Sequence, residues 1–438
     1  MKFFLALILA LLFIIIGIVR WKIHPFFALL LAALGYGFIS GMNVDAIVDS
    51  VNSGFGNTMG NIGLIIYFGV AIGTVLEKSG GAVVLANRLL KIIGEKSVHF
   101  SMMVTGYIIS IPVFADSGFI IMNSLNKALT QKAKLAYAGT TAALALGLMA
   151  THVMVPPTPG PVAAAGILGA NLGNVIFWGI IVSALGLISC YFFAVKIASK
   201  VDLPIVLDSP VESVYKPSLG LSMLCIVVPI VFIVIKSVLE YPGIDATGNV
   251  FYLVFAFLGT PVIALLIGVG LSLFLPQKLD ETIYSATGWL GEALVVAAPI
   301  ILITGAGGIF GAMLHNSGIG DLIAEIFSGK SLGLFFPFML AAALKTTQGS
   351  STVAMIAGAS IVAPMSGALG LDEPFMQTLT VLAIGAGSTV VSHSNDSFFW
   401  VLTQLTGMDV RQGNQVHTVG TLIFGVSAIA IIYLISLF

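Results

Sequence analysis

The chain has 438 residues, of which 58% are hydrophobic and only 8% are charged, with 18 basic and 19 acidic side chains. Soluble proteins carry roughly a quarter charged residues, so this composition excludes a soluble enzyme and a disordered chain, and the net charge of −1 excludes a nucleic-acid-binding protein. A membrane helix needs about 20 mostly apolar residues, which leaves room for roughly ten to fourteen crossings, the size of a secondary transporter.

Apolar runs predict four spans in the first part of the chain. A polar stretch with Asp45 and Asp49 separates the second span from the third. After the third span, a weaker apolar segment contains Arg88 and Lys91, which predicts a helix lying in the membrane interface. The predicted elements are spans at Phe3–Val19, Phe26–Gly41, Ile62–Leu76 and Val175–Ala198, and an interfacial helix at Gly80–Ile93.

A re-entrant hairpin is predicted at about residues 98–130. The run is apolar, but proline, aspartate and glycine within residues 111–118 break its middle. Basic residues collect on the cytoplasmic side, and both flanks are basic, so both ends should face the cytoplasm and the tip, Asp116-Ser117-Gly118, should lie inside the membrane. The flanking basic residues are Arg88, Lys91, Lys96, Lys127, Lys132 and Lys134.

A broken span is predicted at about residues 135–172, because four prolines fall within residues 156–161 and cannot continue a helix. Residues 1–200 then form a first repeat. Residues 201–218 contain four charged residues and three prolines and form a linker, and residues 219–438 form a second repeat.

The second repeat follows the same order of elements. A hairpin is predicted at about residues 332–364 and a broken span at about residues 375–405. The hairpin flanks are mostly acidic here (Asp321, Glu325, Asp372 and Glu373, with Lys330 the exception), so this hairpin should open to the outside. The other predicted elements are spans at Leu219–Ile235, Val250–Leu275, Trp289–Leu314 and Val416–Phe438, and an interfacial helix at Ile319–Phe327.

A glycine motif supports the repeat. Gly69-x3-Gly73-x2-Leu76-x2-Ser79-Gly80 recurs as Gly307-x3-Gly311-x2-Leu314-x2-Ser317-Gly318, at one offset of 238 residues. The predicted fold is an all-α polytopic membrane protein with two inverted-topology repeats, each with about five spans and one re-entrant hairpin. Inverted repeats with paired broken helices are typical of alternating-access transporters whose binding site lies near the bilayer midplane.

The residues at the breaks are the candidate site. Asp116 is an ionisable group at membrane depth, so it could exchange a coupled proton, or it could cap the returning helix. His152 and His393 follow the two hairpins at corresponding places. Each could hydrogen-bond a substrate hydroxyl or carboxylate, or brace a break by bonding a carbonyl group.

Lys345 could bind an anionic substrate, pair with Asp116 or Asp396, or extend toward the bilayer surface. The segment Gly349-Ser350-Ser351-Thr352 offers amides and hydroxyls at a helix start, which favour anions, although Ser350 could be an ordinary N-cap. Asn395 and Asp396 form the fourth break, where Asp396 could cap a helix, bind a cation or exchange a proton.

Thr158 and Gly160 offer exposed backbone at the first broken span, or only form a structural bend, and Ser117 and Gly118 complete the first hairpin tip. Gly305–Gly311 is interpreted as a helix-packing face, since small residues let helices approach. The two cysteines lie in apolar runs and no Cys/His spacing indicates a metal, so no metal site and no cofactor are predicted.

At these breaks the sequence resembles the gluconate:proton symporter (gluconate permease) family, which is similar in fold to the larger ion-transporter superfamily. The resemblance covers essentially the whole chain. It implies proton-coupled uptake of sugar acids across a bacterial inner membrane. Its most specific motifs are Thr151-His152-x3-Pro156-Pro157-x-Pro159-Gly160-Pro161, Gly349-Ser350-x-Thr352-Val353-Ala354 and Ser392-His393-x-Asn395-Asp396-x2-Phe399-Trp400.

Three candidate positions depart from the family pattern. Gluconate permeases carry glutamate where Asp116 stands, histidine where Thr158 stands and arginine where Lys345 stands. A shorter acid, a smaller polar group and a point-like cation would reshape the pocket. A smaller acid such as glycerate, D-serine or hydroxybutyrate is therefore a rival to gluconate.

The main hypothesis is a proton-coupled symporter of a small hydroxylated carboxylate. Lys345 and the Ser350–Thr352 segment would hold the carboxylate, His152, His393, Asn395 and the Thr158 loop would meet hydroxyls, and Asp116 would exchange the proton. Sodium coupling through Asn395 and Asp396 stays open as an alternative, as does a homodimer in the bilayer. An intramembrane enzyme, a channel and a sensor are rival classes. The paired breaks argue against the enzyme, unitary currents would identify a channel, and a sensor would need an output domain that the sequence does not indicate.

Overall fold

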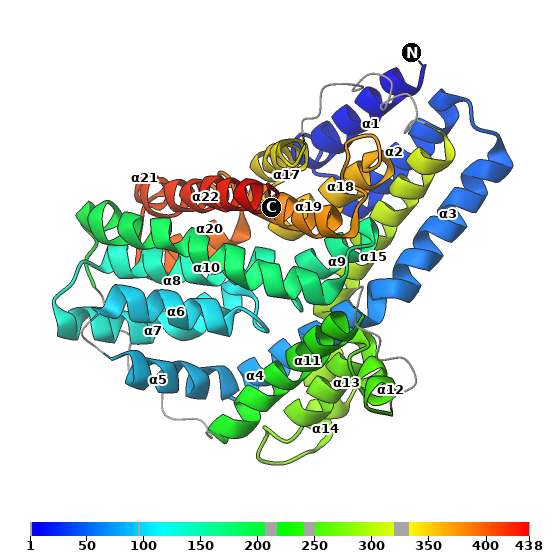
Figure 1. Ribbon diagram of the computed structural model, residues 1–438. Helices are drawn as coiled ribbons and strands as arrows, with labels where there is room; N and C mark the ends of the chain where they lie inside the picture. Colours follow the sequence, from blue (N-terminus) through cyan, green and yellow to red (C-terminus); the bar gives the residue numbers. More distant parts are fainter. Residues whose placement is uncertain (1, 95–96, 206–216, 241–249, 319–332, 438) are drawn as a thin grey trace.

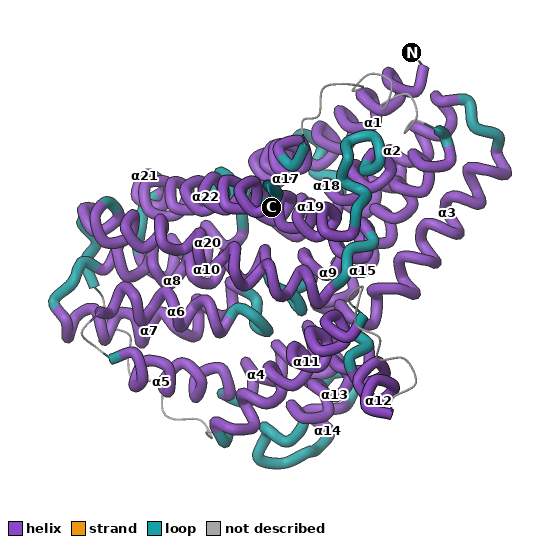
Figure 2. Tube along the Cα trace, in the orientation of Figure 1, coloured by secondary structure: helices purple, strands orange, loops and turns teal. Residues whose placement is uncertain are grey.

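The structure is a computed structural model that describes residues 2–94, 97–205, 217–240, 250–318 and 333–437, and within these ranges it consists of helices and loops (Figures 1 and 2). The helices of the first half are α1 (Lys2–Val19), α2 (Pro25–Ser40), α3 (Val44–Thr58), the π-helix η1 (Met59–Gly63), α4 (Leu64–Lys78), α5 (Gly81–Ile93), α6 (Val98–Ile109), α7 (Ala115–Ala133), α8 (Tyr137–Met154), α9 (Pro159–Leu168), α10 (Leu172–Lys196) and the 3₁₀-helix η3 (Ala198–Lys200).

The helices of the second half are α11 (Leu219–Leu239), α12 (Val250–Leu258), α13 (Pro261–Ser272), α14 (Glu281–Tyr284), α15 (Trp289–Asn316), α17 (Phe335–Gln348), α18 (Ser351–Val362), the 3₁₀-helix η4 (Ala363–Met365), α19 (Pro374–Gly387), α20 (Ser397–Thr406), α21 (Val410–Gly413), the π-helix η5 (Asn414–Thr418) and α22 (Val419–Ile435). The predicted interfacial helix at Ile319–Phe327 and most of the linker at 201–218 lie outside the described residues.

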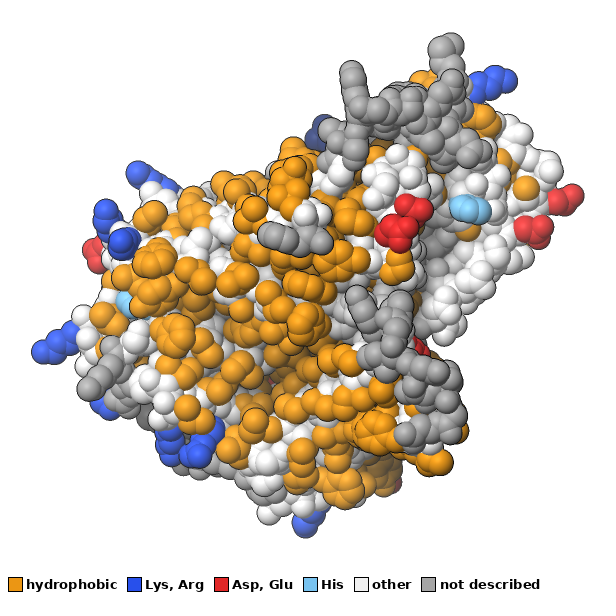
Figure 3. All heavy atoms as spheres, viewed as in Figure 1, with side chains coloured by type: hydrophobic (Ala, Val, Ile, Leu, Met, Phe, Trp, Pro, Cys, Tyr) orange, Lys and Arg blue, Asp and Glu red, His pale blue; other side chains and the backbone are white. Residues whose placement is uncertain are grey.

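Membrane spans are the dominant elements of the described chain. Six helical stretches are long and apolar enough to cross a membrane, and the bent pair α12–α13 would make a seventh. The other predicted spans correspond to apolar helices of 10–17 residues. Breaks shorten α6, α18 and α19, whereas α1 and α2 are short continuous helices. Apolar side chains cover the middle of the visible face, and charged side chains gather toward its edges (Figure 3).

Two predicted spans have different boundaries in the structure. The span predicted at Val250–Leu275 is not one straight helix, because α12 and α13 meet at an angle of 70°. Thr260 is extended there, with ψ of 124°, since the residue before Pro261 disfavours helical backbone. The polar stretch before the third span is helical, and Asn43 caps it by accepting a hydrogen bond from the Ala46 amide at 2.7 Å.

All four predicted breaks are present, with corrected limits. The first break spans residues 110–114, so Asp116-Ser117-Gly118 belongs to the first turn of α7 and does not form the tip. Helix α17 continues through Lys345 to Gln348, and only residues 349–350 separate it from α18. The broken spans are interrupted at residues 155–158 and 388–396.

Two glycines of α4 allow two of these breaks to pack closely against this helix. A Cβ atom on Gly73 would lie 2.1 Å from the carbonyl oxygen of Pro112, and one on Gly69 would lie 2.7 Å from that of Pro157. The break backbones can approach α4 this closely only because both positions lack a side chain. The predicted packing face at Gly305–Gly311 is confirmed, since Gly305 packs against Phe55 and Gly308 against Gly54 and Thr58.

Candidate functional site

A polar cavity of about 130 Å³ lies where three helices begin. The first turns of α7, α18 and α20 line it, together with two residues from the second half of α8. Its lining residues are Phe114, Ala115, Asp116, Met149, His152, Ser350, Ser351, Thr352, Asp396, Ser397 and Phe398. Six of these are predicted site residues, drawn from both halves of the chain, so the structure brings residues at or near all four helix interruptions to one place.

Three helix N-termini therefore converge on this cavity. The first amides of a helix have no acceptor within it, and the macrodipole places partial positive charge at that end. Ser351 and Thr352 begin α18 directly at the cavity, and Ser350 caps the helix by accepting a bond from the Val353 amide at 3.3 Å. The predicted N-cap role of Ser350 is confirmed, and the arrangement favours an anionic group.

Lys345 is fully buried, which rules out the bilayer-surface alternative. Its Nζ lies 2.7 Å from Oδ2 of Asp396, and it also donates to the Gly349 carbonyl oxygen. The Asp396 side chain is only 7% exposed. Of the two predicted partners, Asp396 is thus the one that Lys345 contacts. Lys345 lies behind the cavity lining, with Asp396 between it and the open space.

Asp396 joins the ion pair to the cavity and to the next helix. Its Oδ1 accepts a hydrogen bond from the Phe398 amide at 3.1 Å, so the predicted capping role is confirmed. Its Oδ2 also accepts a hydrogen bond from Ser392. Removing a charge from water costs free energy. An ion-pair partner and hydrogen bonds offset that cost for the buried carboxylate.

Asp116 lies across the cavity from the buried ion pair and is only partly buried. Its Oδ2 accepts a hydrogen bond from Ser397 at 3.4 Å, which links α7 to α20. Residue 114, not Asp116, occupies the N-cap position of α7, and no side chain caps that end. The capping alternative for Asp116 is therefore wrong, and its carboxylate faces the cavity.

The two predicted histidines have different surroundings. His152 lines the cavity, its ring centroid lies 5.9 Å from that of Phe114, and its buried Nδ1 has no hydrogen-bond partner among the described residues. His393 lies outside the lining, with Nε2 3.1 Å from the carbonyl oxygen of Thr346. The carbonyl-bonding alternative thus holds for His393, while His152 presents an unused polar atom near the cavity.

Other predicted residues brace the breaks. The Asn395 side chain donates to the Thr346 carbonyl oxygen at 2.8 Å, and a Cβ on Gly349 would lie 2.0 Å from the Asn395 carbonyl oxygen. Gly349 has φ of +88°, a left-handed conformation that glycine adopts readily. The backbones of the breaks at residues 349–350 and 388–396 therefore approach each other directly.

Hydrogen bonding and close packing also stabilise the break between α8 and α9. Thr158 donates to the Val155 carbonyl oxygen at 2.6 Å across the bend, and Gly160 packs against Met355 of α18. Gly118 packs against Leu148 of α8, and Ser117 lies on the first turn of α7 beside it. None of these residues is among those that line the polar cavity.

Several residues of the site were missed by sequence reasoning. Met149, Ser397 and Phe398 line the cavity, and Ser392 and His417 connect to Asp396 behind it. His417 is a histidine near the start of an apolar span, which is a signal that could have identified it. Within the described residues, no group of three or more His, Cys, Asp or Glu side chains could hold a metal ion.

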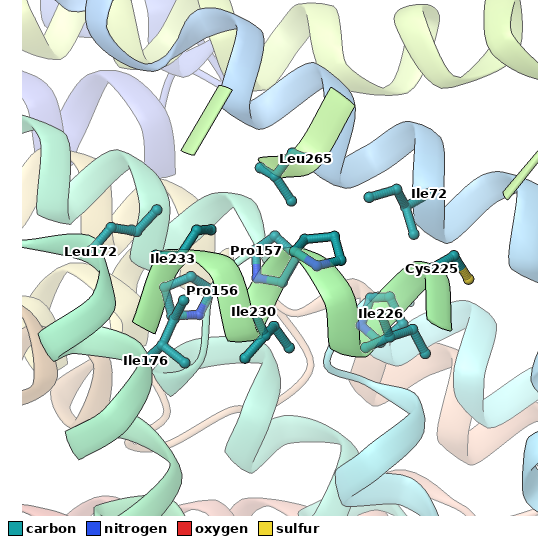
Figure 4. A pocket seen from close by; sticks show the side chains of 12 residues that line it. Ile72, Pro156, Pro157, Leu172, Ile176, Cys225, Ile226, Ile230, Ile233 and Leu265 are labelled. Atoms are coloured by element: carbon teal, nitrogen blue, oxygen red, sulfur yellow. The ribbon is translucent and has the colours of Figure 1, made fainter. Parts of the chain in front are cut away.

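A second cavity lies behind the first broken span and is apolar (Figure 4). Pro156 and Pro157 face Ile72, Cys225 and Leu265 across it, and the open space is only about 10 Å³. Its lining offers no charged side chain and little room, so it cannot hold a polar ligand.

The chain matches one known family over nearly its full length. Residues 2–438 match the family described as GntP family permease. A protein of Haemophilus influenzae named "Uncharacterized permease" is 36% identical over 98% of this chain and 91% of its own length. A gluconate permease of Pseudomonas aeruginosa is 33% identical, over 97% and 95% of the two chains. An L-idonate transporter of the Gnt-II system of Escherichia coli is 30% identical, over 93% and 92%.

Solved transporter structures share the fold. The YdaH transporter of Alcanivorax borkumensis superimposes with a TM-score of 0.67 at 14% identity, over 94% of this chain and 98% of that one. MtrF of Neisseria gonorrhoeae gives a TM-score of 0.61 at 16% identity, over 89% and 84%. At these identities the similarity concerns the fold alone.

The chain belongs to the GntP permease family, as the sequence motifs predict. It is accordingly a multi-pass inner-membrane protein and a transporter, and the predicted class of function is confirmed.

Proposed function

We propose that this GntP family permease takes up gluconate or a related sugar acid together with a proton. The observation that supports this most directly is the polar cavity at the N-termini of α7, α18 and α20, where partial positive charge meets hydroxyl groups. Relatives named gluconate permease and L-idonate transporter align with almost the whole chain. Both named substrates are hydroxylated carboxylates, the chemistry that such a cavity suits.

In this proposal the substrate carboxylate binds at the start of α18. The Ser351 and Thr352 amides and the Ser350 and Thr352 hydroxyls would donate to it, as helix starts do in transporters with broken helices. His152 would use its unpartnered Nδ1 for a substrate hydroxyl. Asp116 faces the same cavity and would bind and release the coupled proton. Substrate bound in the cavity would thereby change how readily Asp116 exchanges its proton.

A smaller acid such as glycerate, D-serine or hydroxybutyrate is the second candidate. The cavity of about 130 Å³ is small beside the roughly 300–1,000 Å³ of typical ligand pockets. Asp116 and Lys345 stand where gluconate permeases carry the longer glutamate and the forked arginine, so the recognition geometry differs from theirs. Gluconate itself would require the cavity to open further during binding.

We propose that the two halves, residues 1–200 and 219–438, are inverted repeats. The offset of 238 that relates the glycine motifs also relates the end of α4 at Lys78 to the end of α15 at Asn316. It relates Ser189 to Ser427, whose hydroxyls lie 2.8 Å apart, as expected for equivalent residues beside a twofold axis. Equivalent pairs of helices also pack across the two halves. Helix α7 of the first half packs on α20 of the second, and α18 of the second half packs on α9 of the first.

In such an arrangement, α6–α7 and α17–α18 are re-entrant hairpins that open to opposite sides. The end of α7 near Lys132 and Lys134 would face the cytoplasm, and the loop with Asp372 and Glu373 would face the outside. Non-helical backbone at membrane depth is stable where protein or a water-filled cavity surrounds it, which matches the contacts of the breaks with α4 and with each other.

We also propose a homodimer that covers the exposed face of α3. This face carries Asn52, Ser53 and Asn57, and Asn61 of η1 continues it, although the helix belongs to a candidate span. Amides facing lipid would be unsatisfied, whereas two copies of one face could bond each other. Cysteine at position 53 or 57 should cross-link two protomers in membranes, and a monomer by native mass spectrometry would contradict the proposal.

Uptake into proteoliposomes tests the function. Purified protein should accumulate labelled gluconate, glycerate or D-serine when the inside is made alkaline, and an uncoupler should abolish the accumulation. Transport that ignores the pH gradient and requires sodium would contradict proton coupling and would favour a cation site at Asn395 and Asp396. Unitary currents in a voltage-clamped bilayer would instead indicate a channel.

A further inference from the structure

A buried chain of four polar side chains runs from η5 to the back of the polar cavity. His417 Nε2 lies 3.1 Å from Ser392 Oγ, Ser392 donates to Asp396 Oδ2, and Lys345 Nζ lies 2.7 Å from the same oxygen. His417 is 1% exposed, Ser392 and Lys345 are fully buried, and Asp396 is 6% exposed. Asp396 also lines the cavity, so His417 is connected to the cavity through one serine hydroxyl and one carboxylate.

The hydrogen-bond donors along this chain determine the protonation of His417. A serine hydroxyl has one proton, and Ser392 directs it toward Asp396. Ser392 must therefore accept from His417, which means that Nε2 of His417 bears a proton. Nδ1 is buried and has no hydrogen-bond partner among the described residues. In the neutral ring Nδ1 has a free lone pair, so a further proton can bind there without breaking the chain of hydrogen bonds.

The side chains around His417 determine which charges act on its ring. Among the described residues, Asp396 and Lys345 are the charged groups that act on it. The rings of Phe398 and Phe399 pack near it, at centroid distances of 5.2 and 6.4 Å. His417 belongs to a π-helical turn, a deformation that is frequent at functional sites.

We propose that His417 is a second proton-binding group, in addition to Asp116, and that its protonation raises the affinity of the cavity for the substrate carboxylate. This inference rests on the proposed sugar-acid symport. With neutral His417, the Lys345–Asp396 pair has no net charge. Protonation at Nδ1 gives the cluster a charge of +1 directly behind the cavity, and a substrate carboxylate neutralises it.

The coupling between the proton on His417 and the bound substrate is electrostatic. A positive charge and a carboxylate attract each other more strongly away from bulk water. Because linkage is reciprocal, bound substrate must favour the proton on His417 by the same factor by which the proton favours substrate. His417 contacts no cavity space itself, so it acts as a positioning residue through Ser392 and Asp396.

The test compares the pH dependence of binding in two histidine variants. Wild-type protein should bind its best sugar acid more weakly as the pH rises from 6 to 8, by up to about tenfold per pH unit for one linked proton. His417→Gln should lose the part of this dependence that comes from His417, keep the part that comes from Asp116, and retain the weaker affinity of the high-pH form. His315→Gln changes an exposed histidine at the end of α15 and should keep the wild-type pH profile.

A second variant and a second measurement keep the proposal testable even if His417→Gln fails to fold. Ser392→Ala keeps both titratable groups but removes the hydroxyl between them, so the pH dependence should weaken even if His417→Gln is unstable. In lightly buffered solution, substrate binding should take up fewer protons with either variant than with wild type.

The outcomes separate the two proposals. If His417→Gln and Ser392→Ala both keep the wild-type slope and proton uptake, the inference about His417 is wrong while symport stands. If the wild-type protein binds none of the sugar acids at any pH, the proposed function itself is wrong. A slope lost in His315→Gln as well would also contradict a specific role for His417.

Discussion

Replacing Gly349 with alanine should disrupt the contact between the second hairpin and the second broken span. Gly349 has φ of +88°, and its Cβ would lie 2.0 Å from the carbonyl oxygen of Asn395. Real Cβ atoms essentially never approach closer than 3.0 Å, so one of the two break backbones must shift by about 1 Å. The left-handed conformation costs alanine about 1–2 kcal/mol, and the forced shift adds about 1–3 kcal/mol.

The matched control is Gly370→Ala, because Gly370 is also left-handed, with φ of +67°, but has open space where the Cβ would lie. It should lose only the conformational part of about 1–2 kcal/mol and should keep wild-type uptake. Gly349→Ala moves the start of α18, where we propose that the carboxylate binds. A misplacement of about 1 Å can cost about 10²-fold in activity, so its uptake should fall by roughly that factor.

Thermal unfolding in detergent and initial uptake rates in proteoliposomes measure the two effects separately. Gly349→Ala should melt at a lower temperature than Gly370→Ala and should transport far more slowly at equal protein density. Equal melting temperatures and equal uptake rates for the two variants would refute the close contact of the two breaks and its role in forming the site.

Three further changes test other parts of the account. Asp116→Asn should abolish gradient-driven uptake while substrate counterflow survives, and unchanged uptake in both assays would remove Asp116 from the coupling mechanism. Asp396→Asn leaves a buried lysine without its carboxylate, which should destabilise the protein by about 3–5 kcal/mol in thermal unfolding; wild-type stability would contradict the ion pair. Gly73→Ala would place a Cβ 2.1 Å from the Pro112 carbonyl oxygen and should impair folding and transport, whereas Gly270→Ala, with open space around it, should change neither.

The sequence allowed the breaks to be predicted because they depend on local chemistry. Clusters of proline, glycine and polar residues interrupt the apolar helices at these places, so the four interruptions could be located to within a few residues, whereas single prolines such as Pro229 and Pro299 stay inside continuous helices. Their limits were less predictable. Lys345 was expected in the second break, yet it lies in the last turn of α17, since Gly349 is the first residue that leaves helical backbone.

The complete cavity lining could not be predicted, because which residues near a break face the cavity depends on how distant elements pack. Lys345 was expected to meet Asp116, Asp396 or the substrate, and only the folded position of the fourth break, which brings Asp396 to within 2.7 Å of Lys345, decides for Asp396. Ser392 and His417 are 25 residues apart and meet through the packing of η5 behind the second break. Single-sequence reasoning provides the residue types near a break but not which of them face the same space.

The bend between α12 and α13 has a local cause that was overlooked. Gly259, Thr260 and Pro261 end one helix and begin another, although the apolar run continues across them. Hydropathy alone does not distinguish one straight span from two short helices at 70°. The offset of 238 on which the proposed repeat rests, in contrast, is visible in the glycine motif, and it also relates Ser189 to Ser427, whose hydroxyls are adjacent.

The central claim is that the sugar acid binds in the polar cavity with its carboxylate at the start of α18. A cryo-EM structure of the protein with bound gluconate, or with the smaller acid that binds best, tests it directly. The account predicts ligand density between Asp116 and His152, with the carboxylate within hydrogen-bond distance of the Ser351 and Thr352 amides. Ligand density elsewhere, with this cavity empty at saturating substrate, would contradict it.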